Sequence, residues 1–235
     1  MSDIVFDPYD YAFQEDPYPT YRRCRDEDPL HHNEDRRAFV FADPEGLAHE
    51  LAVVETPDEP LVAEHPEIPR EHALQGFLGV RAFSSDPERS RRFLEESLGF
   101  EPDGDDRWET RGDYRGGFYA YDAPAEGRGV PGAGTVHHVA WSAPMDEHAG
   151  WVERAVEGGA QPSPVIDRFW FRSIYFREPS GVLFEIASIG PGFATDEDPA
   201  HLGEKLVLPP AFEHLRERIE PALTPLPNPR PAVKS

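Results

Sequence analysis

Two stretches of the chain share one pattern of apolar and polar positions. Residues 41–51, FADPEGLAHEL, align without a gap with residues 176–186, FREPSGVLFEI. Phe, Pro, Gly and Glu stand at the same places, and each stretch is typical of a strand, a Pro/Gly turn and a second strand. The pattern therefore predicts two copies of a β-hairpin whose second arm carries one glutamate among apolar residues.

A weaker repeat links residues 77–83 with residues 136–142. Each is followed by a Pro-containing turn and then by apolar residues at helical spacing. In the first copy the apolar stripe consists of Phe93, Leu94 and Leu98, and Gly99 is expected to end the helix. The order of strand, helix and further strands predicts an α+β fold built from repeated βαβββ units.

The repeats divide the chain into five segments. Residues 76–134 and 135–188 are two complete units, and the second of them holds the candidate site described below. Residues 38–75 supply only the closing hairpin of an earlier unit and a linker. Residues 189–235 form a C-terminal extension in which a short helix is expected around residues 212–223, and residues 1–37 do not fit the repeat.

Composition excludes several classes of partner and site. The 45 acidic and 23 basic residues give a net charge of −22, which disfavours binding to nucleic acid or to anionic lipid. No apolar run approaches the ~18 residues of a membrane span, and the N-terminus lacks the features of a signal peptide, so we expect a cytoplasmic protein. Because Cys24 is the only cysteine, any metal must be held by histidine and carboxylate.

One predicted strand opens with two histidines and the last strand of the same unit carries a carboxylate. His137 and His138 are adjacent, so at most one of them can enter a given pocket if both lie in a strand. Glu185 stands in an apolar strand, where a buried carboxylate needs a partner such as a cation. A histidine and a glutamate are two members of the 2-His-1-carboxylate set that binds non-haem Fe(II). The alternative is a hydrogen-bonded core histidine and an edge glutamate.

Arg168 and Tyr175 lie in the aromatic run that precedes Glu185. The arginine could hold a phenolate or carboxylate substrate, and the tyrosine hydroxyl could donate to substrate or oxygen. Alternatively, the arginine only stacks on aromatic neighbours and the tyrosine only fills the core. Whether Tyr175 shares a face with Glu185 depends on the turn length, because a slip of one residue reverses the face.

With the two hairpins and the segments GAGTVHHVAWS, PVIDRFWFRSIYFREPSGVLFEIAS and GPGFATDEDPAHLGEKLVLPP, the chain resembles the vicinal oxygen chelate superfamily. This superfamily contains glyoxalases, bleomycin-resistance proteins and extradiol dioxygenases. Residues 38–224 are similar to its ring-cleaving dioxygenases of the hydroquinone type. The resemblance implies a half-barrel of βαβββ units, here truncated at the N-terminal side.

The resemblance also implies roles for the candidate residues. His138 and Glu185 would be ligands of Fe(II), or of another divalent metal such as Mn(II). His137 would contact a ligand residue or the substrate, and Arg168 and Tyr175 would line the pocket for a dihydroxylated ring. The family takes one more histidine from the first strand of its first unit, which this chain lacks.

Residues 1–37 resemble instead the opening segment of haem-thiolate cytochrome monooxygenases. The oxygen-binding helix and the Gly-rich cysteine loop of those enzymes are missing from this sequence, so no haem is expected. The segment is interpreted as foreign to the dioxygenase-like part of the chain.

The sequence thus predicts a non-haem Fe(II) ring-cleaving, extradiol-type dioxygenase acting on a small dihydroxylated aromatic and O₂. Its third ligand would come from His31 or His32, from a partner subunit, or from water. A homodimer is expected, because each unit must cover one face of its sheet. Two alternatives remain open: a catalytically inactive ligand-binding or partner-binding protein of the same fold, and a glyoxalase-like metal enzyme.

Overall fold

The computed structural model describes residues 31–33, 38–43, 47–62, 68–124, 132 and 135–224. Two compact units are present. The first contains the chain up to Val139 together with Glu178–Val182, and the second contains Ala140–Arg177 and the chain from Leu183 onward. The predictions for Cys24 and for most of segment 1–37 lie outside the described residues.

The first unit begins with a small antiparallel sheet. Its strands are β1 (His31–Asn33), β2 (Ala38–Ala42) and β3 (Ala48–Ala52), in that order. Strands β2 and β3 form the hairpin that the first copy of the repeat predicts, with Val40 paired to Glu50.

A second sheet in the first unit follows the predicted order of strand, helix and strands. It consists of β4 (Gly79–Phe83), β5 (Glu101–Pro102), β6 (Arg107–Arg111) and β7 (Gly116–Asp122), in the spatial order β4-β7-β6-β5. Strand β7 runs parallel to β4 and antiparallel to β6. Between β4 and β5 the chain forms helix α3 (Glu88–Arg92), which continues as a π-helical turn, η2 (Phe93–Ser97).

The predicted apolar stripe of this helix forms the core of the βαβββ unit of residues 76–134. Phe93, Leu94 and Leu98 are all buried, and Trp108 of β6 is fully buried with them. The helical segment ends before Gly99, whose φ of 74° lies in the left-handed region that favours glycine. The spacing of apolar residues was therefore sufficient to predict both the buried face and the end of the helix.

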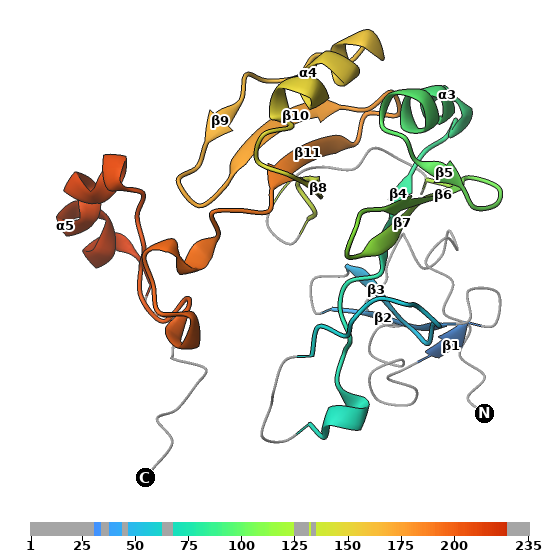
Figure 1. Cartoon of the computed structure of the whole chain (residues 1–235). Helices are drawn as coiled ribbons and strands as arrows, with labels where there is room; N and C mark the ends of the chain where they lie inside the picture. Colours follow the sequence, from blue (N-terminus) through green and yellow to red (C-terminus); the bar gives the residue numbers. More distant parts are fainter. Residues whose placement is uncertain are drawn as a thin grey trace. The chain divides into compact units, whose positions relative to one another are not determined.

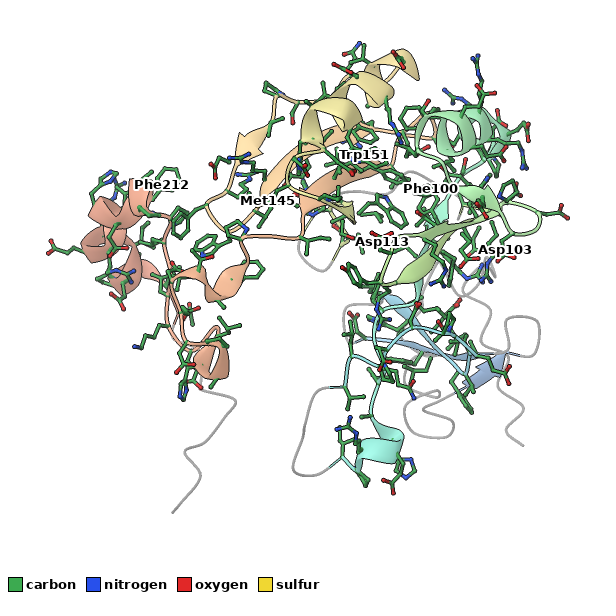
Figure 2. All side chains as sticks on the ribbon, in the orientation of Figure 1. Phe100, Asp103, Asp113, Met145, Trp151 and Phe212 are labelled. Atoms are coloured by element: carbon green, nitrogen blue, oxygen red, sulfur yellow. The ribbon has the colours of Figure 1, made fainter. Side chains whose placement is uncertain are left out.

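The third sheet repeats the order of the second. Its strands are β8 (Val139–Ala143), β9 (Ile166–Asp167), β10 (Arg172–Arg177) and β11 (Leu183–Ser188), arranged β8-β11-β10-β9. Helix α4 (His148–Glu157), which carries Trp151, connects β8 to β9 and packs against β10 and β11 (Figures 1 and 2). Two sheets with the same strand order confirm the α+β fold of repeated βαβββ units.

Short helical segments make up the rest of the described chain. They are η1 (Arg70–His72), η3 (Phe193–Thr195), η4 (Pro199–His201), η5 (Pro210–Leu215), α5 (Arg216–Ile219) and η6 (Glu220–Ala222). The single helix predicted around residues 212–223 is thus divided into three pieces, and the half-exposed Phe212 lies on the first (Figure 2). No helix in the described part is long and apolar enough to cross a membrane.

Candidate functional site

Tyr175 and Glu185 form a direct pair across β10 and β11. They are partners in the register of the hairpin, so both side chains project from the same face of the sheet. The Tyr175 hydroxyl donates a hydrogen bond of 2.6 Å to Oε1 of Glu185, whose residue is only 4% exposed. The turn length, which the sequence left open, therefore brings these two predicted site residues together.

Backbone contacts fix Tyr175 from its other side. Its N–H donates to Oγ of Ser163 at 3.1 Å, and its carbonyl accepts from the N–H of Ser163 at 2.8 Å. With β11 on one side and Ser163 on the other, the tyrosine has little freedom to shift along the sheet. The geometry of its hydroxyl toward Glu185 is therefore set by the fold.

Arg168 joins this pair through the tyrosine ring. Its guanidinium carbon lies 5.7 Å from the centroid of Tyr175, within the range of a cation–π contact. The loop that presents it is held by a 2.8 Å bond from its own N–H to the carbonyl of Phe171 and by a 2.8 Å bond from the N–H of Phe169 to Asp167. Arg168 is exposed, so its stacking on the ring leaves the charged group accessible to an anionic ligand.

The two faces of the third sheet differ in character. Trp141 of β8 packs edge-on against Phe184 of β11, with ring centroids 5.7 Å apart. Phe184 and Ile186, together with Ile174 of β10, are buried on that apolar face. Glu185 alternates with Phe184 and projects from the opposite face of the sheet. One face of β11 is therefore apolar, and the other carries a carboxylate.

His137 and His138 precede β8 and do not lie in it. The prediction that both open a strand was wrong, since ladder pairing begins at Val139. Outside the strand, adjacent side chains need not diverge, and the Nδ1 atoms of the two rings lie 2.9 Å apart. One Nδ1 atom therefore donates a hydrogen bond to the other, so Nδ1 of His138 is occupied by its contact with His137.

The side chains predicted to bind a metal are the imidazole of His138 and the carboxylate of Glu185. An imidazole and a carboxylate suit a divalent transition metal. The carboxylate of Glu185 is oriented by a hydroxyl donor, as ligating carboxylates are. Within the described residues, no group of three or more His, Cys, Asp or Glu side chains is placed to hold a metal ion. His31 and His32 lie in β1, and their side chains are outside the described part of the chain.

The corresponding positions of the other repeat are occupied differently. Glu50, which aligns with Glu185, forms an ion pair with Arg81 at 3.1 Å, and Arg81 also lies 3.5 Å from Asp122. Gly79 occupies the place of His138, and a Cβ atom there would stand 2.5 Å from the ring of Phe118. Close packing thus excludes a histidine at position 79. At Glu50, the guanidinium of Arg81 supplies the positive charge that pairs with the carboxylate.

Sequence reasoning missed two buried polar residues. His148 of α4 is 3% exposed, and its Nε2 donates to the carbonyl of Arg172 at 3.0 Å. Glu178, at the tip of the β10–β11 hairpin, is 2% exposed and accepts from Tyr121 at 2.7 Å. The repeat carried a signal for Glu178, because the aligned position in the first hairpin, Asp43, is also acidic.

The fold and these residues define the class of protein. Residues 76–186 match the model of the Glyoxalase/Bleomycin resistance protein/Dioxygenase superfamily. This part of the chain is a domain of that superfamily, as the βαβββ units predict.

Individual relatives show which kinds of protein in the superfamily this chain is similar to. The chain is 39% identical over 191 residues to "Putative ring-cleaving dioxygenase MhqO" of Bacillus subtilis (strain 168), a match covering 79% of this chain and 60% of that protein. It is 30% identical over 184 residues to chlorohydroquinone/hydroquinone 1,2-dioxygenase of Sphingobium indicum, covering 74% of this chain and 57% of that protein. The chain thus spans about 60% of the length of the curated relatives it matches.

A solved structure agrees with these relatives. The crystal structure of a "putative dioxygenase" from Bacillus subtilis subsp. subtilis str. 168 superimposes with a TM-score of 0.73 and 37% identity. The superposition covers 84% of this chain and 65% of that chain.

A second, short similarity concerns a different class of protein. Forty residues of the chain are 68% identical to "Putative cytochrome P450 123" of Mycobacterium tuberculosis (strain ATCC 25618 / H37Rv). The match covers 17% of this chain and 10% of that protein. It confirms the resemblance to haem-thiolate monooxygenases. A segment that covers a tenth of such an enzyme does not carry the chemistry of the whole enzyme.

Proposed function

We propose that the protein is a non-haem Fe(II) dioxygenase-like protein that cleaves a dihydroxylated aromatic ring beside a hydroxyl-bearing carbon. The observation that carries this proposal is the Tyr175–Glu185 pair, a buried carboxylate held by a hydroxyl on one face of a βαβββ sheet. The names of the relatives, two of which specify ring cleavage or a hydroquinone substrate, support the same reaction class.

His138 and Glu185 are the proposed metal ligands. His138 precedes β8, the strand next to β11 in the sheet, and β11 carries Glu185. Because Nδ1 of His138 contacts His137, Nε2 is the proposed ligand atom. A bound Fe(II) ion would supply open coordination positions for the diol and O₂.

The remaining residues act on the substrate and on the ligands. Arg168, exposed above the Tyr175 ring, binds a phenolate oxygen through charge-assisted hydrogen bonds. The hydroxyl of Tyr175 donates a hydrogen bond to Oε1 of Glu185, which orients the carboxylate. His137 holds the ring of His138 through the contact between their Nδ1 atoms.

The metal site also needs donors beyond these two residues. We propose that they come from His31 or His32, from a second copy of the chain in a homodimer, or from water. Mn(II) is an alternative metal for the same donor set. A cytoplasmic location, with neither nucleic acid nor membrane as partner, accords with the net charge of −22.

Anaerobic loading with Fe(II), followed by oxygen uptake with catechol and hydroquinone, tests the proposal. The wild type is expected to retain about one iron per chain, and H138A and E185Q are expected to lose about tenfold or more in affinity. The matched control is E50Q, because Glu50 stands at the same place in the other hairpin but pairs with Arg81. Equal iron retention in wild type, H138A and E185Q would refute the assignment.

One observation favours a second candidate function. Among the residues that the structure describes, no group of three or more His, Cys, Asp or Glu side chains is placed to hold a metal ion. A ligand-binding protein without catalytic activity fits this observation. Retention of an aromatic diol without oxygen uptake, in the presence or absence of iron, would identify this function. Iron-dependent turnover of a substrate without oxygen uptake would instead identify a glyoxalase-like enzyme.

A further inference from the structure

The carboxylate of Glu178 is buried and accepts four hydrogen bonds from residues of the first compact unit. It lies at the hairpin tip and is 2% exposed. Its Oε2 accepts from the hydroxyl of Tyr121 at 2.7 Å, from the N–H of Ser180 at 2.9 Å and from the hydroxyl of Ser90. Its Oε1 accepts from the N–H of Val182 at 2.8 Å. Four donors thus compensate the cost of burying this charge.

The donors come from separate elements of the first unit. Ser90 lies in α3 and Tyr121 in β7, whereas Ser180 and Val182 belong to the tip itself. Burial, followed by the charge of Glu178, raises the pKa of the Tyr121 phenol above its ordinary value. The phenol therefore keeps its proton and remains a donor at neutral pH.

The first hairpin shows what an acidic turn residue does by itself. There the N–H of Asp43 donates to the carbonyl of Leu47 at 3.0 Å, and the N–H of Leu47 donates to Oδ1 of Asp43 at 2.9 Å. Glu178 and Val182 make the same two bonds, at 3.1 and 2.8 Å. The bonds to Tyr121 and Ser90 are therefore additional to what closing the turn requires.

We propose that Glu178 is a positioning residue that fixes the register of the β10–β11 hairpin and so keeps Tyr175 and Glu185 paired on one face. Only two pairs, Arg177 with Leu183 and Phe176 with Phe184, separate the turn from the Tyr175–Glu185 pair. A slip of one residue would move Glu185 to the apolar face. The hydrogen bonds from Tyr121 and Ser90 to Glu178, whose side chain is longer than that of Asp43, hold the tip of the hairpin and oppose that slip. The effect on metal binding rests on the function proposed above.

The test uses the full chain and two readouts. Glu178→Gln keeps the shape of the side chain but places an amide NH₂ group among the donors. We expect faster hydrogen–deuterium exchange in the peptide spanning the tip, and an affinity for added Co(II) that is about tenfold weaker or more, by absorption spectroscopy. D43N is the matched control, because it alters the corresponding turn residue in the first hairpin. It is expected to leave Co(II) affinity unchanged.

The two readouts separate this proposal from the proposed function. If hydrogen–deuterium exchange at the tip is unchanged in E178Q, the proposed role of Glu178 in fixing the register is overturned. If exchange is faster but Co(II) affinity is unchanged, Glu178 stabilises the hairpin without positioning the metal ligands. A wild type that does not bind Co(II) overturns the metal site as well. If E178Q does not fold, Y121F, which removes one donor and keeps the charge, must show the same two changes to a smaller degree for the proposal to stand.

Discussion

At the scale of single residues, three carboxylates of the described chain each face a different kind of donor. Glu185 stands between Phe184 and Ile186 in a strand that is otherwise apolar, and its carboxylate is held by the Tyr175 hydroxyl. Glu178 is buried among hydroxyl and amide donors, and Glu50 is paired with Arg81. The three carboxylates differ in what faces them, and that difference separates the candidate metal ligand from the structural ones.

Removing the hydroxyl of Tyr175 tests its share in this arrangement. We expect Tyr175→Phe to lower the free energy of unfolding by about 1–3 kcal/mol, because a buried carboxylate loses a charge-assisted donor. Urea denaturation measures the difference. Tyr114→Phe is the control, since Tyr114 is 87% exposed. Equal stability of the two variants would mean that Glu185 does not depend on Tyr175.

At the scale of elements, the linker after β3 is attached to the β6–β7 hairpin by one carboxylate. Asp58 accepts from the N–H of Gly116 at 3.0 Å and from Arg111 at 2.6 Å. The bond from Gly116, and then the guanidinium of Arg111, hold the pKa of Asp58 below its usual value. The folded state therefore binds this proton more weakly than the unfolded chain does.

A pH series measures that linkage. Because the pKa is lowered on folding, the stabilisation by Asp58 is present above its unfolded pKa of about 3.9 and is lost as the pH falls through the lower folded value. We expect Asp58→Asn to lower the Tm at neutral pH and to approach the wild-type Tm in acid. Asp113→Asn, in the same hairpin turn, is the control and should follow the wild type at every pH (Figure 2). A pH-independent difference for D58N would contradict the role of its charge.

At the scale of the whole molecule, charge repulsion is the dominant long-range interaction. A net charge of −22 on 235 residues opposes the compact state and repels anionic partners. The ion pairs described above act locally and leave this excess of carboxylates in place. Stability is therefore expected to depend on ionic strength.

Thermal unfolding in increasing NaCl tests this expectation. Raising the ionic strength from about 0.01 M to about 0.15 M shortens the Debye length from ~30 Å to ~8 Å and weakens repulsion between exposed carboxylates. The Tm is expected to rise over this range, with KCl giving the same rise as NaCl at equal ionic strength. A fall in Tm would show that attractive pairs such as Arg111–Asp58 outweigh the repulsion.

The sequence determined the units of this fold. Period-two and helical spacing of apolar residues, with Pro and Gly at the turns, are local properties, so the repeated hairpins, the stripe of Phe93, Leu94 and Leu98, and the stop at Gly99 could all be predicted. The choice of Glu185 and Tyr175 as candidates was also possible, because a single carboxylate in an apolar strand requires a partner.

Only the tertiary structure decided which partners those residues have. The turn length set the register that pairs Tyr175 with Glu185, and packing between distant segments placed Arg81 on Glu50, the ring of Phe118 against Gly79, and Tyr121 on Glu178. These contacts join residues far apart in the chain. No local pattern encodes them, because burial and hydrogen bonding depend on which elements meet after folding.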